Sequence, residues 1–232
     1  MIETEIEIDA SVFNPIARQE YETSSSEIKK DGPLVTCGNY HQRLDEGITT
    51  ALATTEETPA CSNGCWYCCY YKVDLRAEEA FRIINYIRRK FSKEKLVELR
   101  RDISEKAKIM KSLTHQEQLA INMKCPFLDN NSCSIYVVRP EKCRTFHSQD
   151  VEGCRQSYEE PTNLKIPNSY ITAVLNSNEA HSEGYRKAIG EQGYDNITTK
   201  LNTVLNIAMV DAKYRKRYVK KKRAFPQSVS RE

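Results

Sequence analysis

Eight of the nine cysteines fall into two groups whose residue type and spacing suit metal binding. Four lie within nine residues, in the sequence C-S-N-G-C-W-Y-C-C, and four more are widely spaced downstream. Thiols this close together, in a chain without secretory features, are more typical of metal ligands than of disulfides. Thiolates favour zinc, copper(I) and iron–sulfur clusters over harder ions. The expected metal ligands are Cys61, Cys65, Cys68, Cys69, Cys125, Cys133, Cys143 and Cys154.

The number of thiols fits two four-ligand sites, or one site with auxiliary thiols. Cys68 and Cys69 are adjacent in the chain, so their side chains diverge and are poorly placed to bind one ion together. We expect one of them to join Cys61 and Cys65, while the other faces a second site or stays free. The alternative is that several of the eight are buried as small apolar residues. Burial is the expected state of Cys37, which stands apart from both groups.

Basic residues surround Cys143 in the sequence. Arg139, Lys142 and Arg144 could neutralise a negatively charged thiolate site and donate hydrogen bonds to sulfur, or the two arginines could pair with surface carboxylates. His147 follows Cys143 by four residues, so it could be a further ligand, although a solvent-facing or hydrogen-bonded histidine is the favoured reading. The remaining histidines lack ligand spacing and are expected on the surface: His41, His115 and His181.

Bulk properties limit the remaining functions. The chain has 232 residues, enough for one ordinary domain. Its first ten residues do not resemble a signal peptide, and no stretch approaches the roughly 20 apolar residues that cross a bilayer. We therefore expect a cytoplasmic protein, in a compartment where thiols stay reduced. None of the 8 glycines forms a dinucleotide-binding turn or a P-loop.

The elements that must position the cysteines are expected to be mainly α, a helical domain around a small irregular cysteine-rich metal-binding core with a short hairpin. Residues 1–58 are predicted to be a poorly ordered N-terminal segment and linker, because of Ser24-Ser25-Ser26 and Asp31-Gly32-Pro33. Residues 59–160 would form the cysteine-cluster metal-binding domain. Residues 161–223 would be a C-terminal helical extension packing on it, and 224–232 a tail.

Apolar periodicity and turn residues place the individual elements. One helix is expected to begin at Asp74, with Glu78 and Glu79 in its first turns, where the helix dipole favours anions. A second is expected to begin at Ser92. A short strand is predicted over residues 70–73, a hairpin over 124–136 and a short helix over 139–144. Two further helices are predicted over residues 169–189 and 196–219.

The spacing C-x3-C-x2-C at Cys61, Cys65 and Cys68 equals the motif of radical S-adenosylmethionine enzymes, in which three thiolates hold a four-iron cluster. Those enzymes need repeated strand–helix units that form a partial barrel. The downstream sequence instead indicates helices with few apolar strands, and it lacks a Gly-Gly-Glu stretch. This reading is therefore kept only as a further alternative.

A different resemblance covers residues from about Cys61 to Cys154. The cysteine motif is followed by Val73-Asp74-Leu75 and Ala77-Glu78-Glu79-Ala80, and then by Cys125-Pro126-Phe127-Leu128, Cys133-Ser134-Ile135-Tyr136, Arg139-Pro140 and Cys143-Arg144-Thr145-Phe146. In this order the pieces closely resemble the family named for its CxxCxxCC motif, which is described as zinc- or iron-chelating and is similar to flagellin lysine-N-methylases. Trp66-Tyr67 departs from the family, where small residues are common, and these rings could close or reshape access to the metal.

The resemblance implies a metal-binding cysteine-cluster protein, with an iron–sulfur cluster as the first expectation and zinc as the second. It also suggests an enzyme that modifies protein side chains, for example by lysine methylation with S-adenosylmethionine, acting on an unidentified protein substrate. The alternative is a zinc-stapled binding module that contacts an acidic partner or RNA. Eight of the eleven residues from Lys213 to Arg223 are basic and could bind nucleic acid, although a solvated helix end is the favoured reading.

Overall fold

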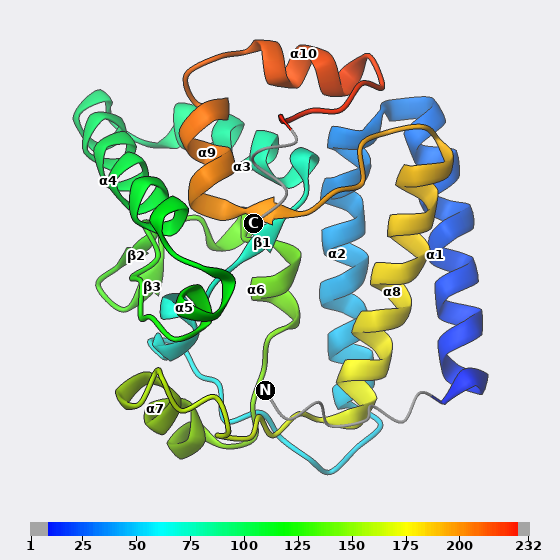
Figure 1. Ribbon diagram of the computed structural model, residues 1–232. Coiled ribbons are helices and arrows are strands. Elements are labelled where there is room, and N and C mark those ends of the chain that lie inside the picture. The colour runs from blue at the N-terminus through cyan, green and yellow to red at the C-terminus, as the bar shows by residue number, and fades with distance from the viewer. Residues whose placement is uncertain (1–8, 227–232) are drawn as a thin grey trace.

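Three long helices form one side of the molecule. The computed structural model describes residues 9–226. Helices α1 (Ala10–Asp31), α2 (Pro33–Leu52) and α8 (Thr172–Glu191) pack against one another (Figure 1). Gly184 allows α1 to approach α8 closely, because a Cβ at this position would lie 2.3 Å from the carbonyl oxygen of Ala17.

Helices α1 and α2 correct the expectation of a poorly ordered segment over residues 1–58, of which residues 1–8 lie outside the described residues. The serine-rich stretch is helical, and its Ser24 is buried and donates to Oε1 of Glu20 at 2.5 Å. Arg43 of α2 donates to both carboxylate oxygens of Glu20. The buried polar groups of α1 thus find their hydrogen-bond partner, Arg43, on the neighbouring helix α2. Gly32, with φ of +80°, does provide the expected break between the two helices.

Four further helices pack around the larger apolar core. Their apolar side chains, including Ile83, Ile87 and Ile103, are buried together, as the helical spacing predicted. Ser92 precedes the second of them and accepts a hydrogen bond from the N–H of Lys95 at 3.2 Å. The four are α3 (Ala77–Lys90), α4 (Lys93–Ser112), α9 (Leu201–Ala208) and α10 (Lys213–Val219).

The single helix expected over residues 196–219 is divided. Strand β4 (Thr199–Lys200) precedes α9 and pairs antiparallel with β1 (Asp74–Leu75), which also explains why α3 begins after Asp74. Asp211 accepts from the N–H of Lys213 at 2.8 Å and starts α10 separately. The strand predicted over residues 70–73 is wrong: Tyr70 ends a 3₁₀ helix, η1 (Tyr67–Tyr70), residues 71–73 are irregular, and β1 begins at Asp74.

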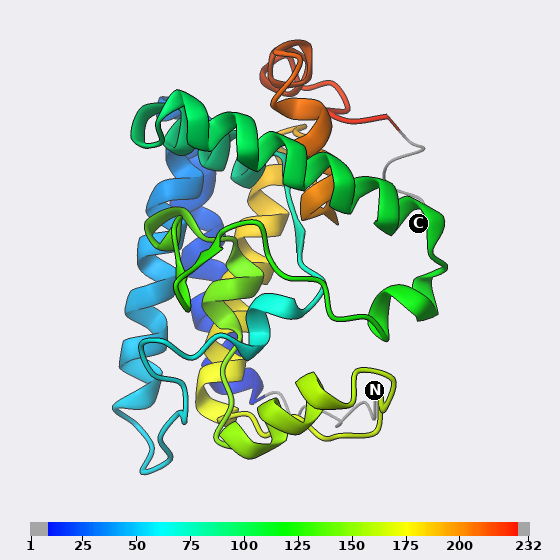
Figure 2. The same ribbon diagram turned by 90° about the vertical axis from the view of Figure 1, so that its left-hand side faces the viewer.

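Short elements carry the cysteine-rich segment between α4 and α8. Strands β2 and β3 form the expected hairpin, whose turn residues Asn130 and Asn131 have φ of +48° and +59°. In both views the hairpin, η1 and α7 lie on the same side of α4 (Figures 1 and 2). The fold is mainly α, as predicted. The short elements are α5 (His115–Leu119), β2 (Leu128–Asp129), β3 (Ser132–Cys133), η2 (Tyr136–Val138), α6 (Glu141–Thr145) and α7 (Val151–Glu159).

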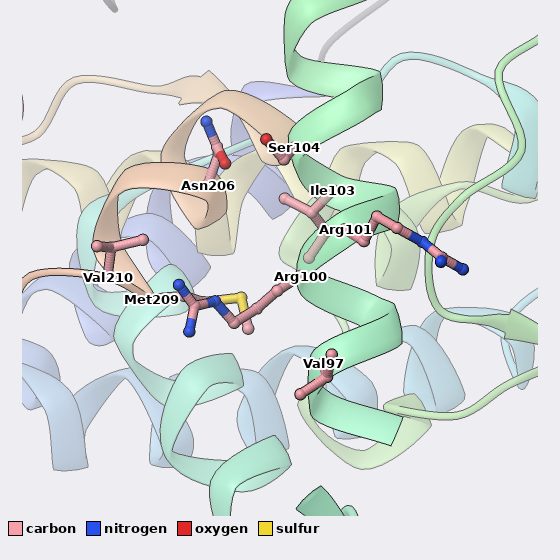
Figure 3. A pocket seen from close by; sticks show the side chains of 8 residues that line it. All are labelled: Val97, Arg100, Arg101, Ile103, Ser104, Asn206, Met209 and Val210. Atoms are coloured by element: carbon pink, nitrogen blue, oxygen red, sulfur yellow. The ribbon is translucent and has the colours of Figure 1, made fainter. Parts of the chain in front are cut away.

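A surface pocket of about 340 Å³ lies between α4 and α9 (Figure 3). Its walls combine aliphatic side chains with arginine, serine and asparagine, and none of the lining residues is a cysteine. Among the helices of residues 9–226, none has the length and apolar character needed to cross a membrane.

Candidate metal centre

Backbone hydrogen bonds bring the two cysteine groups together. The N–H of Cys125 donates to the carbonyl oxygen of Cys69 at 2.7 Å, which joins η1 to the start of the hairpin segment. The N–H of Ala60 donates to the carbonyl oxygen of Ser148 at 2.8 Å, which joins the loop before η1 to the segment before α7. The upstream cysteines are therefore held at both ends against the downstream ones.

Cys125, Cys133 and Cys143 form one set of neighbouring thiols, the hairpin group. Cys125 and Cys133 each accept a backbone hydrogen bond from the residue two positions further on, Phe127 and Ile135. Burial raises the pKa of Cys125 to about 12. Burial, followed by the nearby thiols of Cys125, Cys68 and Cys133, raises the pKa of Cys143 well above its usual value, although its side chain is exposed to solvent.

Cys61, Cys65 and Cys154 form a second set, the loop group. Ser148 lies beside two of its members: its backbone lowers the pKa of Cys61 and its hydroxyl lowers that of Cys154, while the hydroxyl itself donates to the carbonyl oxygen of Asp150 at 3.1 Å. Burial raises the pKa of both thiols, and the thiol of Cys65 contributes to each shift. In the loop that carries Cys61 and Cys65, Gly64 has φ of +89°, a conformation that glycine adopts without strain.

Cys68 is a neighbour of both groups. Its thiol acts on the pKa of Cys61 and Cys154 in the loop group and on that of all three members of the hairpin group. A hydrogen bond with Cys69, followed by burial, raises the pKa of Cys68 itself. The structure therefore gathers the eight predicted cysteines from η1, the hairpin, α6, α7 and the loop around residue 61 into one region, and it excludes Cys37, which is fully buried elsewhere.

The donor set fits a thiophilic metal. All eight thiols are reduced and all are at least partly accessible to solvent, and for four of them neighbouring hydrogen-bond donors lower the pKa against the effect of burial, which favours the thiolate. In the described part of the chain, no three Cys, His, Asp or Glu side chains already stand in the arrangement of a metal ion's ligands. Metal binding by these thiols would require them to lose their protons.

Aromatic rings join η1 to α7, the helix that carries Cys154. Trp66 packs edge-on against Tyr158 of α7 with centroids 4.9 Å apart, and Tyr70 contacts the same ring at 4.9 Å. Tyr158 lies one helical turn after Cys154. The rings therefore fasten η1 to α7.

The polar residues around Cys143 have other partners. Arg144 and Arg139 bind the carboxylate of Asp45 at 2.5 and 3.5 Å, which is the surface-carboxylate alternative. Both arginines still lower the pKa of Cys133, against the larger effect of burial. In His147, Nδ1 lies 3.0 Å from the carbonyl oxygen of Thr145 and Nε2 accepts the N–H of Ile171 at 2.9 Å, so both ring nitrogens are occupied.

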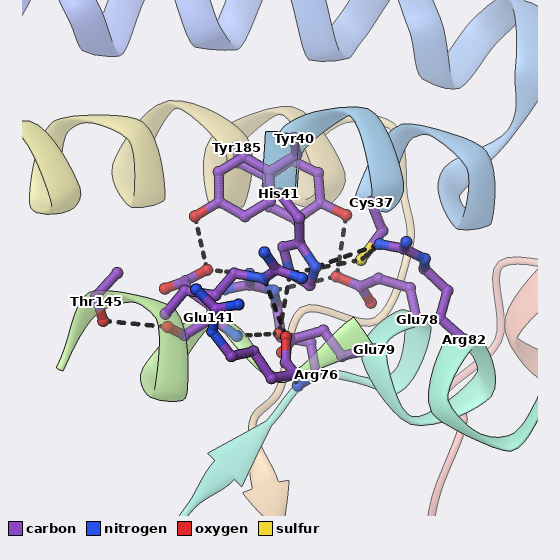
Figure 4. A network of polar contacts seen from close by, with 12 residues as sticks. Cys37, Tyr40, His41, Arg76, Glu78, Glu79, Arg82, Glu141, Thr145 and Tyr185 are labelled. Carbon is purple, nitrogen blue, oxygen red and sulfur yellow. Dashed lines mark hydrogen bonds and ion pairs between the residues drawn. The ribbon is translucent and has the colours of Figure 1, made fainter. Parts of the chain in front are cut away.

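Next to Cys143, a buried ion-pair network ties α6 to α3 (Figure 4). The guanidinium of Arg76 binds Glu141 and donates to Glu78 at 3.1 Å. Glu141 also accepts hydrogen bonds from Tyr40 at 2.7 Å and from Ser182 at 2.8 Å. Burial opposes ionisation of Glu141, but the charge of Arg76 lowers the pKa of this carboxyl overall.

The same network corrects the placement of His41, which was expected on the surface but is buried in α2. Its Nε2 lies 3.3 Å from Glu79 and its Nδ1 lies 3.2 Å from Arg82. Glu79 accepts from the backbone N–H groups of Arg76 and Glu141 at 2.8 and 2.7 Å. Despite the opposing effect of burial, Arg76 and His41 lower the pKa of Glu79 to about 2.

Sequence reasoning missed Ser148 and the buried network. Glu78 and Glu79 were read as anions at a helix start, and Glu79 does accept the N–H of Arg76 there. Both are buried, however, and bind residues from four other helices, α2, α6, α8 and α10. His181 was also expected on the surface, whereas it is partly buried 3.1 Å from Glu20. His115 is exposed, as predicted.

Comparison with known proteins supports metal chelation. Residues 60–165 match the CxxCxxCC family, whose description reads "Putative zinc- or iron-chelating domain". This stretch contains all eight clustered cysteines and leaves out α1, α2 and α8–α10. No curated protein and no solved structure matches the chain.

Proposed function

We propose that this protein binds an iron–sulfur cluster through the hairpin group and Cys68, since residues 60–165 match the CxxCxxCC family model of a zinc- or iron-chelating domain. The observation that supports the proposal is that the thiol of Cys68, on η1, lies near enough to raise the pKa of Cys125, Cys133 and Cys143, which other elements carry. Four thiolates suit an iron–sulfur cluster, and the backbone hydrogen bonds to Cys125 and Cys133 would tune it.

The loop group would form a second site with three thiolates. A metal site that keeps a position free of protein ligands can accept a substrate or cosubstrate, whereas a closed four-ligand site is structural. Cys61 is exposed, which would leave such a position reachable from solvent. Modification of protein side chains, such as lysine methylation with S-adenosylmethionine, is the activity that the family resemblance favours for this site.

The first test is anaerobic purification of the full chain, followed by absorption spectroscopy and analysis of iron, zinc and acid-labile sulfide. A brown protein with a broad band near about 400 nm and equal amounts of iron and sulfide is expected. A colourless protein with stoichiometric zinc would contradict the iron–sulfur proposal and would favour the zinc-stapled binding module.

Single substitutions test the division into two groups. Cys143→Ser should remove the metal of the hairpin group, and Cys61→Ser should remove only that of the loop group. Cys37→Ala is the matched control, because this thiol is buried away from both groups. Loss of all metal in either of the first two variants would show that the thiols serve one site.

A further inference from the structure

Charge is unevenly distributed along the chain. Residues 88–111 and 211–223 contain 18 of the 35 Lys and Arg residues but only 5 of the 32 Asp and Glu residues. The remaining 17 basic and 27 acidic residues give the rest of the chain a formal charge of −10, so the net charge of +3 conceals a strong separation. Such a separation creates a local positive potential that the overall charge does not reveal.

The two basic stretches meet in the fold. The first stretch covers the end of α3 and all but the last residue of α4, and the second covers the region of α10. Helix α9 packs against both α4 and α3, and α10 packs against α3, so the two stretches lie close together (Figure 1). We call their cations the basic face. Its members are Arg88, Arg89, Lys90, Lys93, Lys95, Arg100, Arg101, Lys106, Lys108, Lys111, Lys213, Arg215, Lys216, Arg217, Lys220, Lys221, Lys222 and Arg223.

Most of these cations are not neutralised within the protein. Of the cations of the basic face, only Lys95, Lys106 and Lys213 have a carboxylate within 4.0 Å among residues 9–226. The solvated end of α10 alone would be unremarkable, since cations favour a helix C-terminus. The cations of α4 lie along the whole length of that helix, so the helix dipole does not explain them.

The pocket between α4 and α9 lies within the basic face. Arg100 reaches from α4 toward Met209, while Arg101 points to the other side of the helix (Figure 3). In the described part of the chain neither guanidinium has a hydrogen bond or ion pair. Ser104 and Asn206 line the same pocket and offer further donors. Arg100, Ser104 and Asn206 offer donors that match the oxygen atoms of phosphate, and Arg101 adds a cation on the adjoining side of α4.

We propose that the basic face binds the phosphate backbone of nucleic acid, with Arg100 and Arg101 as central contacts. An extended polyanion fits cations spread over several helices better than a small ligand does. A membrane site would be expected to present aromatic anchors, whereas the exposed large hydrophobic residues of this face are aliphatic: Val97, Ile109, Val210 and Val219.

Binding should show little sequence preference. Tyr218 is buried and Tyr214 packs against Phe225 with centroids 5.7 Å apart, so neither ring is free to stack on a base. Phosphate contacts position a protein on nucleic acid but carry no sequence information. The affinity should instead fall steeply as the salt concentration rises, because the free energy gained by releasing counterions from the phosphates then becomes smaller.

The test uses the full chain as purified and a fluorescein-labelled 20-nucleotide RNA, with binding followed by anisotropy at several salt concentrations. The double variant Arg100→Glu/Arg101→Glu should weaken binding by about 10-fold or more and reduce the slope of log K against log salt by about 2. The control is Lys29→Glu/Lys30→Glu, an equal charge change on exposed residues of α1, which should change affinity by less than about 3-fold.

Circular dichroism and metal content of each variant separate this test from that of the metal site, since all four substituted side chains are exposed. Absence of RNA binding by the unmodified protein would overturn the proposal. Equal weakening by the two double variants would also overturn it, because net charge alone would then explain binding. So would tighter binding to vesicles of anionic phospholipid, or to polyglutamate, than to RNA.

Discussion

Ser148 lies beside two candidate ligands: its backbone lowers the pKa of Cys61 and its hydroxyl lowers that of Cys154, against the larger effect of burial. Residues that hydrogen-bond metal ligands tune affinity without touching the ion, and their loss commonly costs 10–100-fold. We predict that Ser148→Ala weakens metal binding at the loop group by roughly 10-fold and leaves the hairpin group unchanged. Competition with a chelator of known affinity measures both sites.

Ser112→Ala is the control, since its exposed hydroxyl donates only to the carbonyl oxygen of Ile109. Equal loss at both groups in Ser148→Ala would show that this serine supports the whole segment and not the loop group alone.

Glu79 makes the free energy of unfolding depend on pH. Its pKa is lowered to about 2 in the folded protein from an ordinary value of 4.5, so its contribution is complete above about pH 4.5 and is lost as the pH falls toward 2. Burial raises the pKa of Glu78 and favours its neutral form, so its contribution to stability changes with pH in the opposite direction. We predict that Glu79→Gln flattens the decline of the unfolding free energy between pH 5 and 2, in urea titrations, whereas Glu78→Gln does not.

The sequence was enough to predict the cysteines as candidate metal ligands, because clustered thiols are recognisable from residue type and spacing alone. The roles of Ser148, Arg76 and Glu79 depend instead on partners far along the chain, such as Glu141, which lies 62 positions after Glu79. A glutamate at a helix start is common on surfaces, so nothing local distinguished the buried one.

At the scale of elements, Arg76 connects the start of α3 to α6, the helix that carries Cys143. Removing one partner of a buried ion pair leaves the other charge without compensation. We predict that Arg76→Met lowers the free energy of unfolding by about 3–5 kcal/mol, measured by urea denaturation.

Arg88→Met on the same helix provides the comparison, because Arg88 is exposed and bonds only to the carbonyl oxygen of Met209. It should change stability by less than about 0.5 kcal/mol. A similar effect of both substitutions would mean that the buried pair contributes nothing specific.

The crossing of α1 and α8 depends on Gly184. A methyl group there would overlap the carbonyl oxygen of Ala17, so Gly184→Ala should destabilise the protein by about 1–3 kcal/mol in thermal or urea unfolding. Gly190, in the same helix, has its nearest neighbour at 3.6 Å, and Gly190→Ala should be neutral or slightly stabilising. Equal tolerance at both positions would mean that α1 can move away without cost.

Elements with strong apolar periodicity, such as α3 and α4, were predictable, and so was the Asn-rich hairpin turn. Helix α1 was not, because it buries Glu20 and Ser24 and relies on Arg43 of another helix to satisfy them. No pattern within residues 10–31 contains that information, since the partner lies outside the helix.

At the scale of the whole molecule, two apolar clusters are distinct. One is shared by α1, α2 and α8, and the other by α3, α4, α9 and the hairpin. We predict that removing the metal with a chelator under reducing conditions loosens residues 60–160 and leaves α1, α2 and α8 helical. Hydrogen exchange measures both regions; equal loss of protection in α1 and α8 would contradict this division.

The packing of α1 and α2 on α8 also has a consequence for biosynthesis. About 120 residues separate Leu52, the end of α2, from Thr172, which the ribosome translates in roughly 6–24 s at 5–20 residues per second. During that interval the first two helices have emerged without their partner, whereas all eight clustered cysteines are made before α8. Metal delivered during translation would therefore find its ligands complete before the N-terminal helices can close on the nascent chain.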